Sequence, residues 1–133
     1  MYLIDANIFL ELLYKRQRWA ESYRFLHKVR AGEVKGYVLQ FALHGISAIL
    51  AKPELVGVFL TEISTWRGLE VVRSDLEDEI EAARAAAKVG LDFDDGLHYY
   101  YAKKLGLAVV SFDKDFDKTD VKRLEPAEAA GEA

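Results

Sequence analysis

Short apolar runs alternate with longer segments of helical periodicity along the whole of this 133-residue chain. The apolar runs have the length of strands and lie at 2–4, 37–39, 69–73, 107–112 and 121–124. Between them, apolar residues recur every three or four positions over 9–30, 39–50, 53–66, 74–88 and 92–105. Because helices rather than tight hairpin turns connect the runs, the strands should be parallel. The pattern predicts an α/β fold of three layers, α/β/α, with a central parallel sheet of four to five strands.

The length and composition fit one domain with its own core. The chain is 51% hydrophobic, which excludes a disordered protein. We expect residues 1–125 to form this domain and the small, acidic segment 126–133 to be a frayed tail. Polar residues interrupt the apolar N-terminus, which lacks a basic leader, so neither a signal peptide nor a membrane span is predicted. A cytoplasmic protein without a membrane partner is the expectation.

The composition also narrows the chemistry. The chain has no cysteine, which excludes disulfides, thiolate nucleophiles and cysteine-ligated zinc, but leaves sites with oxygen ligands open. A net charge of −4 argues against a phosphate-binding surface spread over the whole molecule. The negative charge is concentrated, because seven of the ten aspartates fall between positions 92 and 120.

Three aspartates from distant parts of the sequence should meet at one edge of the sheet. Asp5 and Asp113 each end a strand, and ligands of open parallel sheets bind outside the carboxyl ends of the strands. Asp95 opens a helix that leads into the strand before Asp113, and a right-handed crossover returns it to the same edge. A divalent cation would keep such carboxylates ionised, and Mg²⁺ or Mn²⁺ suits an all-oxygen shell. The alternative for each aspartate is a helix cap or turn residue.

The residues around these aspartates are open to more than one interpretation. Asn7 either hydrogen-bonds substrate, fixes the Asp5 carboxylate, or forms a local turn. The acids that follow Asp113 alternate as in a calcium loop, but Lys118 stands where glycine is needed and Leu124 where glutamate is needed. We therefore interpret Asp115 and Asp117 as loop acids, with a place in the outer shell of a metal as the alternative.

Three motifs in the expected order resemble the PIN domain, the metal-dependent ribonuclease fold of VapC-like toxins in toxin–antitoxin pairs. They are Leu3-Ile-Asp5-Ala-Asn7, Phe93-Asp-Asp95-Gly-Leu-His-Tyr-Tyr-Tyr-Ala102 and Val109-Val-Ser111-Phe-Asp113-Lys-Asp-Phe116. The resemblance implies that Asp5, Asp95 and Asp113 hold one or two divalent ions and activate water for phosphodiester hydrolysis. It also implies assistance from Asn7 and Ser111, a possible outer-shell place for Asp94, an RNA substrate, a small antitoxin partner and a homodimer.

One departure from the family pattern concerns the second helix. The family usually supplies a glutamate there, and this sequence has His44 or Gly45 at that position. His44 could offer a nitrogen ligand or bind substrate phosphate; a buried histidine bonded to backbone is the alternative. We assign His98, with the three tyrosines that follow it, to packing or a dimer surface, the alternative being a place in the groove beside Asp95.

Two main functional hypotheses follow. The first is a metal-dependent endoribonuclease, the toxin of a toxin–antitoxin pair. The second is a catalytically silent PIN-like module that binds RNA or protein, which the missing glutamate would favour. A metal-dependent phosphatase ranks last, because the first strand is not followed by the Asp-x-Asp pair that such enzymes often carry. Basic residues near the aspartates could help to bind RNA, although most should form salt bridges; they are Lys103, Lys104, Lys114, Lys118, Lys122 and Arg123.

Overall fold

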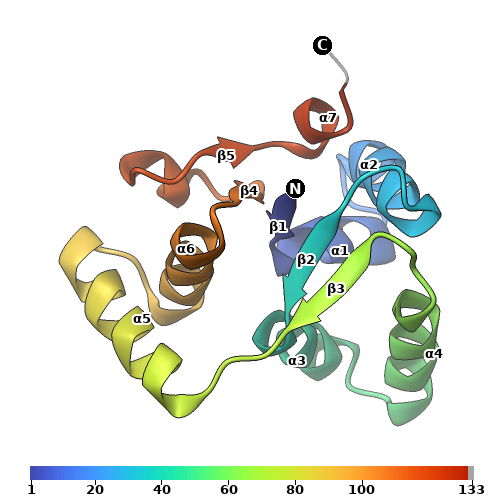
Figure 1. Cartoon of the computed structure of the whole chain (residues 1–133). Helices are drawn as coiled ribbons and strands as arrows, with labels where there is room; N and C mark the ends of the chain where they lie inside the picture. Colours follow the sequence, from blue (N-terminus) through green and yellow to red (C-terminus); the bar gives the residue numbers. More distant parts are fainter. Residues whose placement is uncertain (132–133) are drawn as a thin grey trace.

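A five-stranded parallel sheet forms the centre of the computed structural model, which describes residues 1–131 (Figure 1). The strands are β1 (Tyr2–Ile4), β2 (Gly36–Leu39), β3 (Leu69–Val72), β4 (Ala108–Val110) and β5 (Arg123–Leu124). They are arranged in the order β3-β2-β1-β4-β5, and every pair is parallel. Helices on both sides of the sheet complete the three layers, so the predicted fold class is confirmed.

The central strand β1 leads from the core to the carboxyl edge of the sheet, where Asp5 lies. Leu3 and Ile4 are fully buried, as both faces of a central parallel strand are. Leu3 pairs with Tyr37 of β2 and with Val109 of β4. The ladder continues one residue further, where the Asp5 amide donates to the Val110 carbonyl at 3.0 Å. Asp5 therefore leaves the core at the carboxyl edge with its backbone fixed.

The segment after β1 forms two helices, where the periodicity predicted one over 9–30. These are α1 (Ala6–Leu13) and α2 (Trp19–Ala31). Lys15 takes a positive φ of 46°, which an α-helix does not allow. The Arg18 amide donates to the Glu11 carboxylate at 2.7 Å, and the Arg18 guanidinium pairs with Glu125 at 2.6 Å. These contacts of Arg18 stabilise the break between α1 and α2, and the spacing of apolar residues along the sequence does not predict them.

The C-terminal segment is also more ordered than the sequence suggested. Residues after Glu125 form the short helix α7 (Pro126–Ala129) instead of a frayed tail. Glu125 and Glu128 form a capping box, and Ala129 and Ala130 are buried. The Lys28 ammonium of α2 donates to the Ala130 carbonyl at 2.7 Å. These contacts dock α7 on α2; the predicted tail's residues 132–133 lie outside the described part of the chain.

The remaining helices connect the strands and form the outer layers. They are α3 (Gln40–Leu50), α4 (Pro53–Ser64), α5 (Leu76–Val89) and α6 (Phe93–Leu105), and a short 3₁₀ helix, η1 (Lys114–Lys118), follows β4. Helices α5 and α6 lie side by side (Figure 1). Gly96 lets them approach, because a Cβ there would collide with the Cβ of Ala86. Since α6 carries Asp95, this contact helps to position the acidic site.

Gly96→Ala should destabilise the protein by about 1–3 kcal/mol, because the added methyl group overpacks the contact between α5 and α6. Gly57→Ala is the matched control. Gly57 also lies within a helix, away from the ends of α4, but no neighbouring atom lies within 4 Å of an added Cβ. This control should gain about 0.5–1 kcal/mol from its higher helix propensity. Urea unfolding of both variants checks the prediction, and equal effects of the two substitutions would contradict it.

Candidate metal centre

The three aspartates singled out in the sequence lie together at the carboxyl edge of the sheet. Asp5 follows β1 and Asp113 follows β4, while Asp95 lies in the first turn of α6. Asp5 is 5% exposed and Asp95 is 6% exposed, although carboxylates are rarely so deeply buried. Their charges act on one another, because both Asp113 and Asp5 raise the pKa of Asp95.

The Ser111 hydroxyl holds the two strand ends in place. It donates to Asp5 Oδ2 at 2.6 Å and accepts from the Asp113 amide at 2.9 Å. Asn7 completes this network, since its Nδ2 lies 3.3 Å from Asp5 Oδ2 and 3.2 Å from Ser111 Oγ. Its Oδ1 accepts from the Phe112 amide at 3.3 Å. Of the interpretations open for Asn7, these contacts favour the one in which it fixes the Asp5 carboxylate.

Asp95 and Asp113 form the first group of possible cation ligands. Burial raises the pKa of Asp95 to about 8, together with its hydrogen bond to Asp113 and the charges of Asp113, Asp92 and Asp5. Oxygen atoms of Asp95, Asp113 and Asp115 lie within 4.8 Å of one another. The Asp115 amide also donates to Asp113 at 2.9 Å, which orients that carboxylate. Asp115 is therefore close enough to Asp95 and Asp113 to bind the same cation.

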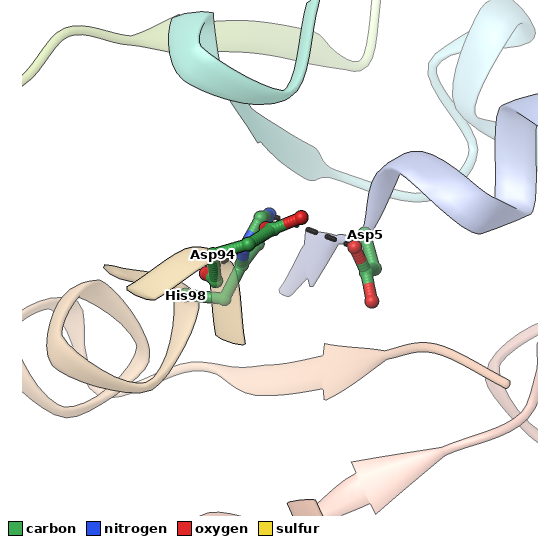
Figure 2. Close-up of side chains that lie close together, drawn as sticks. All are labelled: Asp5, Asp94 and His98. Carbon is green, nitrogen blue, oxygen red and sulfur yellow. Dashed lines mark hydrogen bonds and ion pairs between the residues drawn. The ribbon is translucent and has the colours of Figure 1, made fainter. Parts of the chain in front are cut away.

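The second group of possible cation ligands contains His98, for which packing or a dimer surface was the expectation. Asp5, Asp94 and His98 each place a ligand atom within 4.8 Å of the others. Figure 2 shows Asp94 and His98 projecting from α6 towards Asp5 at the end of β1. His98 Nε2 lies 3.9 Å from Asp5 Oδ1. Asp94 and His98 are four residues apart on one helix face, a spacing that could have indicated this group.

His98 is fully buried, and its surroundings favour positive charge. Burial lowers the pKa of the imidazole, but the charge of Asp5 and the hydrogen bonds and charge of Asp94 outweigh it and raise the pKa to about 9. The Nδ1 atom lies 2.9 Å from the Asp94 carbonyl and 3.2 Å from Asp94 Oδ1. Nε2 has no hydrogen-bond partner among residues 1–131. The imidazole therefore belongs to the acidic site as well as to the core.

Two other candidates lie outside both groups. His44 is exposed, in contrast to the buried alternative, and lines a cavity of about 120 Å³ with Gln40, Phe41, Ser74 and Glu79. Asp117 is engaged elsewhere, because its two carboxylate oxygens accept from Arg123 at 2.9 and 3.1 Å. This ion pair lowers the pKa of Asp117. Within the described residues, neither side chain belongs to a cluster that could hold a metal.

The donor set fits a divalent cation. Buried carboxylates that raise one another's pKa need a positive charge nearby to remain ionised together. Carboxylate oxygens with one imidazole nitrogen suit Mg²⁺ or Mn²⁺, and the nitrogen favours Mn²⁺ of the two. Asp5 belongs to the group around His98, and its charge also reaches Asp95. The two groups are therefore neighbouring parts of one acidic site.

Comparison with known protein families gives a match over most of the chain. The PIN domain family model matches residues 2–122, which is most of the chain. The chain belongs to the PIN domain family. PIN domains form a family of nucleases, so membership supports a hydrolase. Among curated proteins, none matches the sequence significantly. None of the helices within residues 1–131 has the length and hydropathy needed to span a bilayer.

Solved structures with the same fold include a toxin and a toxin–antitoxin complex. VapC20 of Mycobacterium tuberculosis, a toxin that cleaves the sarcin–ricin loop, gives a TM-score of 0.77 at 15% identity, over 95% of this chain and 100% of that one. A toxin–antitoxin complex from Klebsiella pneumoniae gives 0.74 at 14% identity, over 95% and 98%. FitAcB from Neisseria gonorrhoeae gives 0.69 at 18% identity, also over 95% and 98%. At these identities the likeness concerns the fold.

Asp95→Asn should stabilise the metal-free protein at neutral to alkaline pH. The Asp95 pKa rises from 3.8 to about 8 on folding, so the folded state binds an extra proton between these values. Stability should therefore fall as the pH rises through this window, and the variant should lose less of it. Urea unfolding in EDTA at about pH 5 and about pH 8 should show a gain of at least about 1 kcal/mol for the variant at the higher pH. A variant with the same pH dependence as the wild type would contradict this assignment.

Proposed function

We propose that this PIN domain protein is a divalent-metal-dependent endoribonuclease and the toxin of a toxin–antitoxin pair. The observation that carries the proposal is the convergence of Asp5, Asp95 and Asp113 at one edge of the sheet, from positions as far apart as 5 and 113 in the sequence. Such a set has no evident structural purpose, since buried carboxylates that repel one another cost stability. Family membership supports a nuclease, and the toxins among the solved structures support the biological role.

In this proposal, different residues bind the cation, orient the attacking water and position the ligands. Asp5, Asp95 and Asp113 would hold Mg²⁺ or Mn²⁺, which when bound supplies Lewis-acid activation of water and of the phosphoryl oxygen. Asp5 or Asp113 would orient the attacking water or accept its proton. Ser111 and Asn7 keep Asp5 in position, and Ser111 does the same for Asp113 through the Asp113 amide. Asp94 and Asp115, each within one of the two groups, extend this set.

Binding of RNA to an acidic edge requires basic groups nearby as well as the cation. Most of the basic residues considered above are already engaged: Lys103 pairs with Asp120, Lys104 with Asp78 and Arg123 with Asp117. Lys118 donates to the Gly90 carbonyl at 2.8 Å. Lys114 directly follows Asp113 and is exposed, so we propose it as a phosphate contact. The exposed His44 is a second candidate for this role, on the α3 side.

A protein partner is supported by apolar side chains on the outer surface of α3 and α4. Ile49, Leu55 and Val58 are 51%, 49% and 71% exposed, and Leu60 is 38% exposed. Leu55 and Val58 lie three residues apart on one face of α4, and exposed apolar surface of this kind can mark an interaction site. We propose that this surface binds an antitoxin or a second copy of the chain. The solved toxin–antitoxin complexes with the same fold make the antitoxin a natural partner.

The second hypothesis, a silent binding module, has one observation in its favour. The family's second-helix acid corresponds to His44 or Gly45, and neither supplies a carboxylate. Gly45 has open space around it, since no neighbouring atom lies within 4 Å of an added Cβ. A silent module would bind RNA or a protein without cleaving RNA in any divalent cation. The cleavage assay below separates the two hypotheses.

Asp113→Asn should abolish RNA cleavage. The amide that replaces the carboxylate removes a cation ligand and a base, so the rate should fall by about 100-fold or more. The assay uses a fluorescent single-stranded RNA with Mn²⁺ or Mg²⁺, and EDTA should stop cleavage by the wild type. The matched control is Asp120→Asn, which removes an aspartate of the same acidic stretch that pairs with Lys103 and Tyr99 outside the site.

The control variant should cleave RNA at close to the wild-type rate. Cleavage by the wild type that persists in EDTA would contradict a metal-dependent enzyme. If protein prepared without an antitoxin cleaves none of the RNAs tested, with either cation, the silent module is favoured instead.

A further inference from the structure

We propose that His98 is a ligand for a divalent cation, through Nε2, together with Asp5 and Asp94. The inference deepens the proposed function, because it assigns a nitrogen ligand to the acidic site. The resemblance to the family gives this residue no role, and the expectation from the sequence was packing or a dimer surface. The proposal rests on the orientation of the imidazole ring, on the free oxygen of Asp5 and on the position of Asp94.

The imidazole is oriented as a metal ligand is. Its Nδ1 lies 2.9 Å from the backbone carbonyl of Asp94, an acceptor, so Nδ1 carries a hydrogen in this bond. In the neutral ring Nε2 then carries the free lone pair. Histidines that bind metals are commonly held by a bond of this kind from their other ring nitrogen. Nε2 is buried without a hydrogen-bond partner in residues 1–131, which would be costly if nothing bound there.

Asp5 presents one oxygen to this nitrogen. Its Oδ2 is occupied by the Ser111 hydroxyl at 2.6 Å and by Asn7, which leaves Oδ1 directed at His98. The distance from Oδ1 to Nε2 is 3.9 Å, too long for a hydrogen bond. Two atoms that share an ion, each at about 2.0–2.2 Å, are roughly 3–4 Å apart. The gap therefore has the size that a bound cation needs.

Asp94 supplies the third ligand and an entry route. It lies one helical turn before His98 on α6, and its Oδ1 lies 3.2 Å from Nδ1 of the ring. One of its carboxylate oxygens lies within 4.8 Å of the ligand atoms of Asp5 and His98. The Asp94 side chain is 55% exposed, whereas the side chains of His98 and Asp5, taken alone, are 0% and 7% exposed. Solvent thus reaches the group from the Asp94 side. The cation would enter there and displace any proton held by His98.

A nitrogen ligand changes the expected metal preference. Imidazole suits Mn²⁺ better than Mg²⁺, which strongly prefers oxygen and water. His98 would also supply a ligand in a chain whose α3 lacks the family's acid. Without a cation, His98 could instead act as a positively charged partner of Asp5, and this is the main rival explanation. The two differ in whether nitrogen touches the bound ion.

Pulsed electron paramagnetic resonance of bound Mn²⁺ detects such a nitrogen directly. The chain has three histidines, His27, His44 and His98, which makes the signal assignable. We expect tag-free wild-type protein with Mn²⁺ to show coupling to one imidazole nitrogen. His98→Gln should lose it and bind Mn²⁺ at least about tenfold more weakly by calorimetry, whereas Mg²⁺ affinity should change less. His27→Gln and His44→Gln are the matched controls and should keep the coupling.

Labelling tests the proposal without any substitution, in case His98→Gln fails to fold. Wild-type protein grown with ¹⁵N-histidine should show the nitrogen coupling replaced by that of ¹⁵N. Mn²⁺ bound without nitrogen coupling, in protein that still cleaves RNA with Mn²⁺, would overturn the role of His98 and leave the proposed function intact. Failure to bind either cation would overturn both.

Discussion

The hydroxyl of Ser111 is the contact on which the acidic site depends. It links the end of β1 to the end of β4 by donating to Asp5 and accepting from the Asp113 amide. Ser111 is fully buried, so both bonds are made away from solvent, where an unsatisfied partner is costly. Through Asn7 the same network reaches the Phe112 amide. One side chain thereby fixes carboxylates that would otherwise move apart.

This arrangement opposes stability and favours cation binding. Asp95 is held so close to Asp113 and Asp5 that its pKa rises to about 8, and the folded state without a cation keeps a proton there. Such strain is usual at functional sites, where groups are held in positions that their own chemistry disfavours. On the other side of Asp5, His98 contributes positive charge or a lone pair according to its protonation. With His98 neutral, a cation at this edge would meet carboxylates on one side of Asp5 and an imidazole lone pair on the other.

The positions where the strands end could be predicted from the sequence, and with them the place of two of the aspartates. A parallel sheet of four to five strands follows from apolar runs separated by helices, and Asp5 and Asp113 follow from where two of those runs stop. The break between α1 and α2 depends on Arg18 and Glu125, which are 107 residues apart, and local periodicity does not register such a pair. Helix α7 likewise depends on docking to Lys28. The place of His98 in the site was missed because the tyrosine-rich sequence of α6 does not indicate which face of the helix meets the end of β1.

The central claim is that the carboxyl edge of this sheet is a divalent-cation site. Crystals of the wild-type protein soaked in Mn²⁺ test it most directly, because anomalous scattering locates manganese without reference to any assumed ligand. The account predicts anomalous density among Asp5, Asp95 and Asp113, and beside His98 Nε2 in the group that includes Asp94. Manganese found elsewhere on the protein, with no density at this edge, would contradict it.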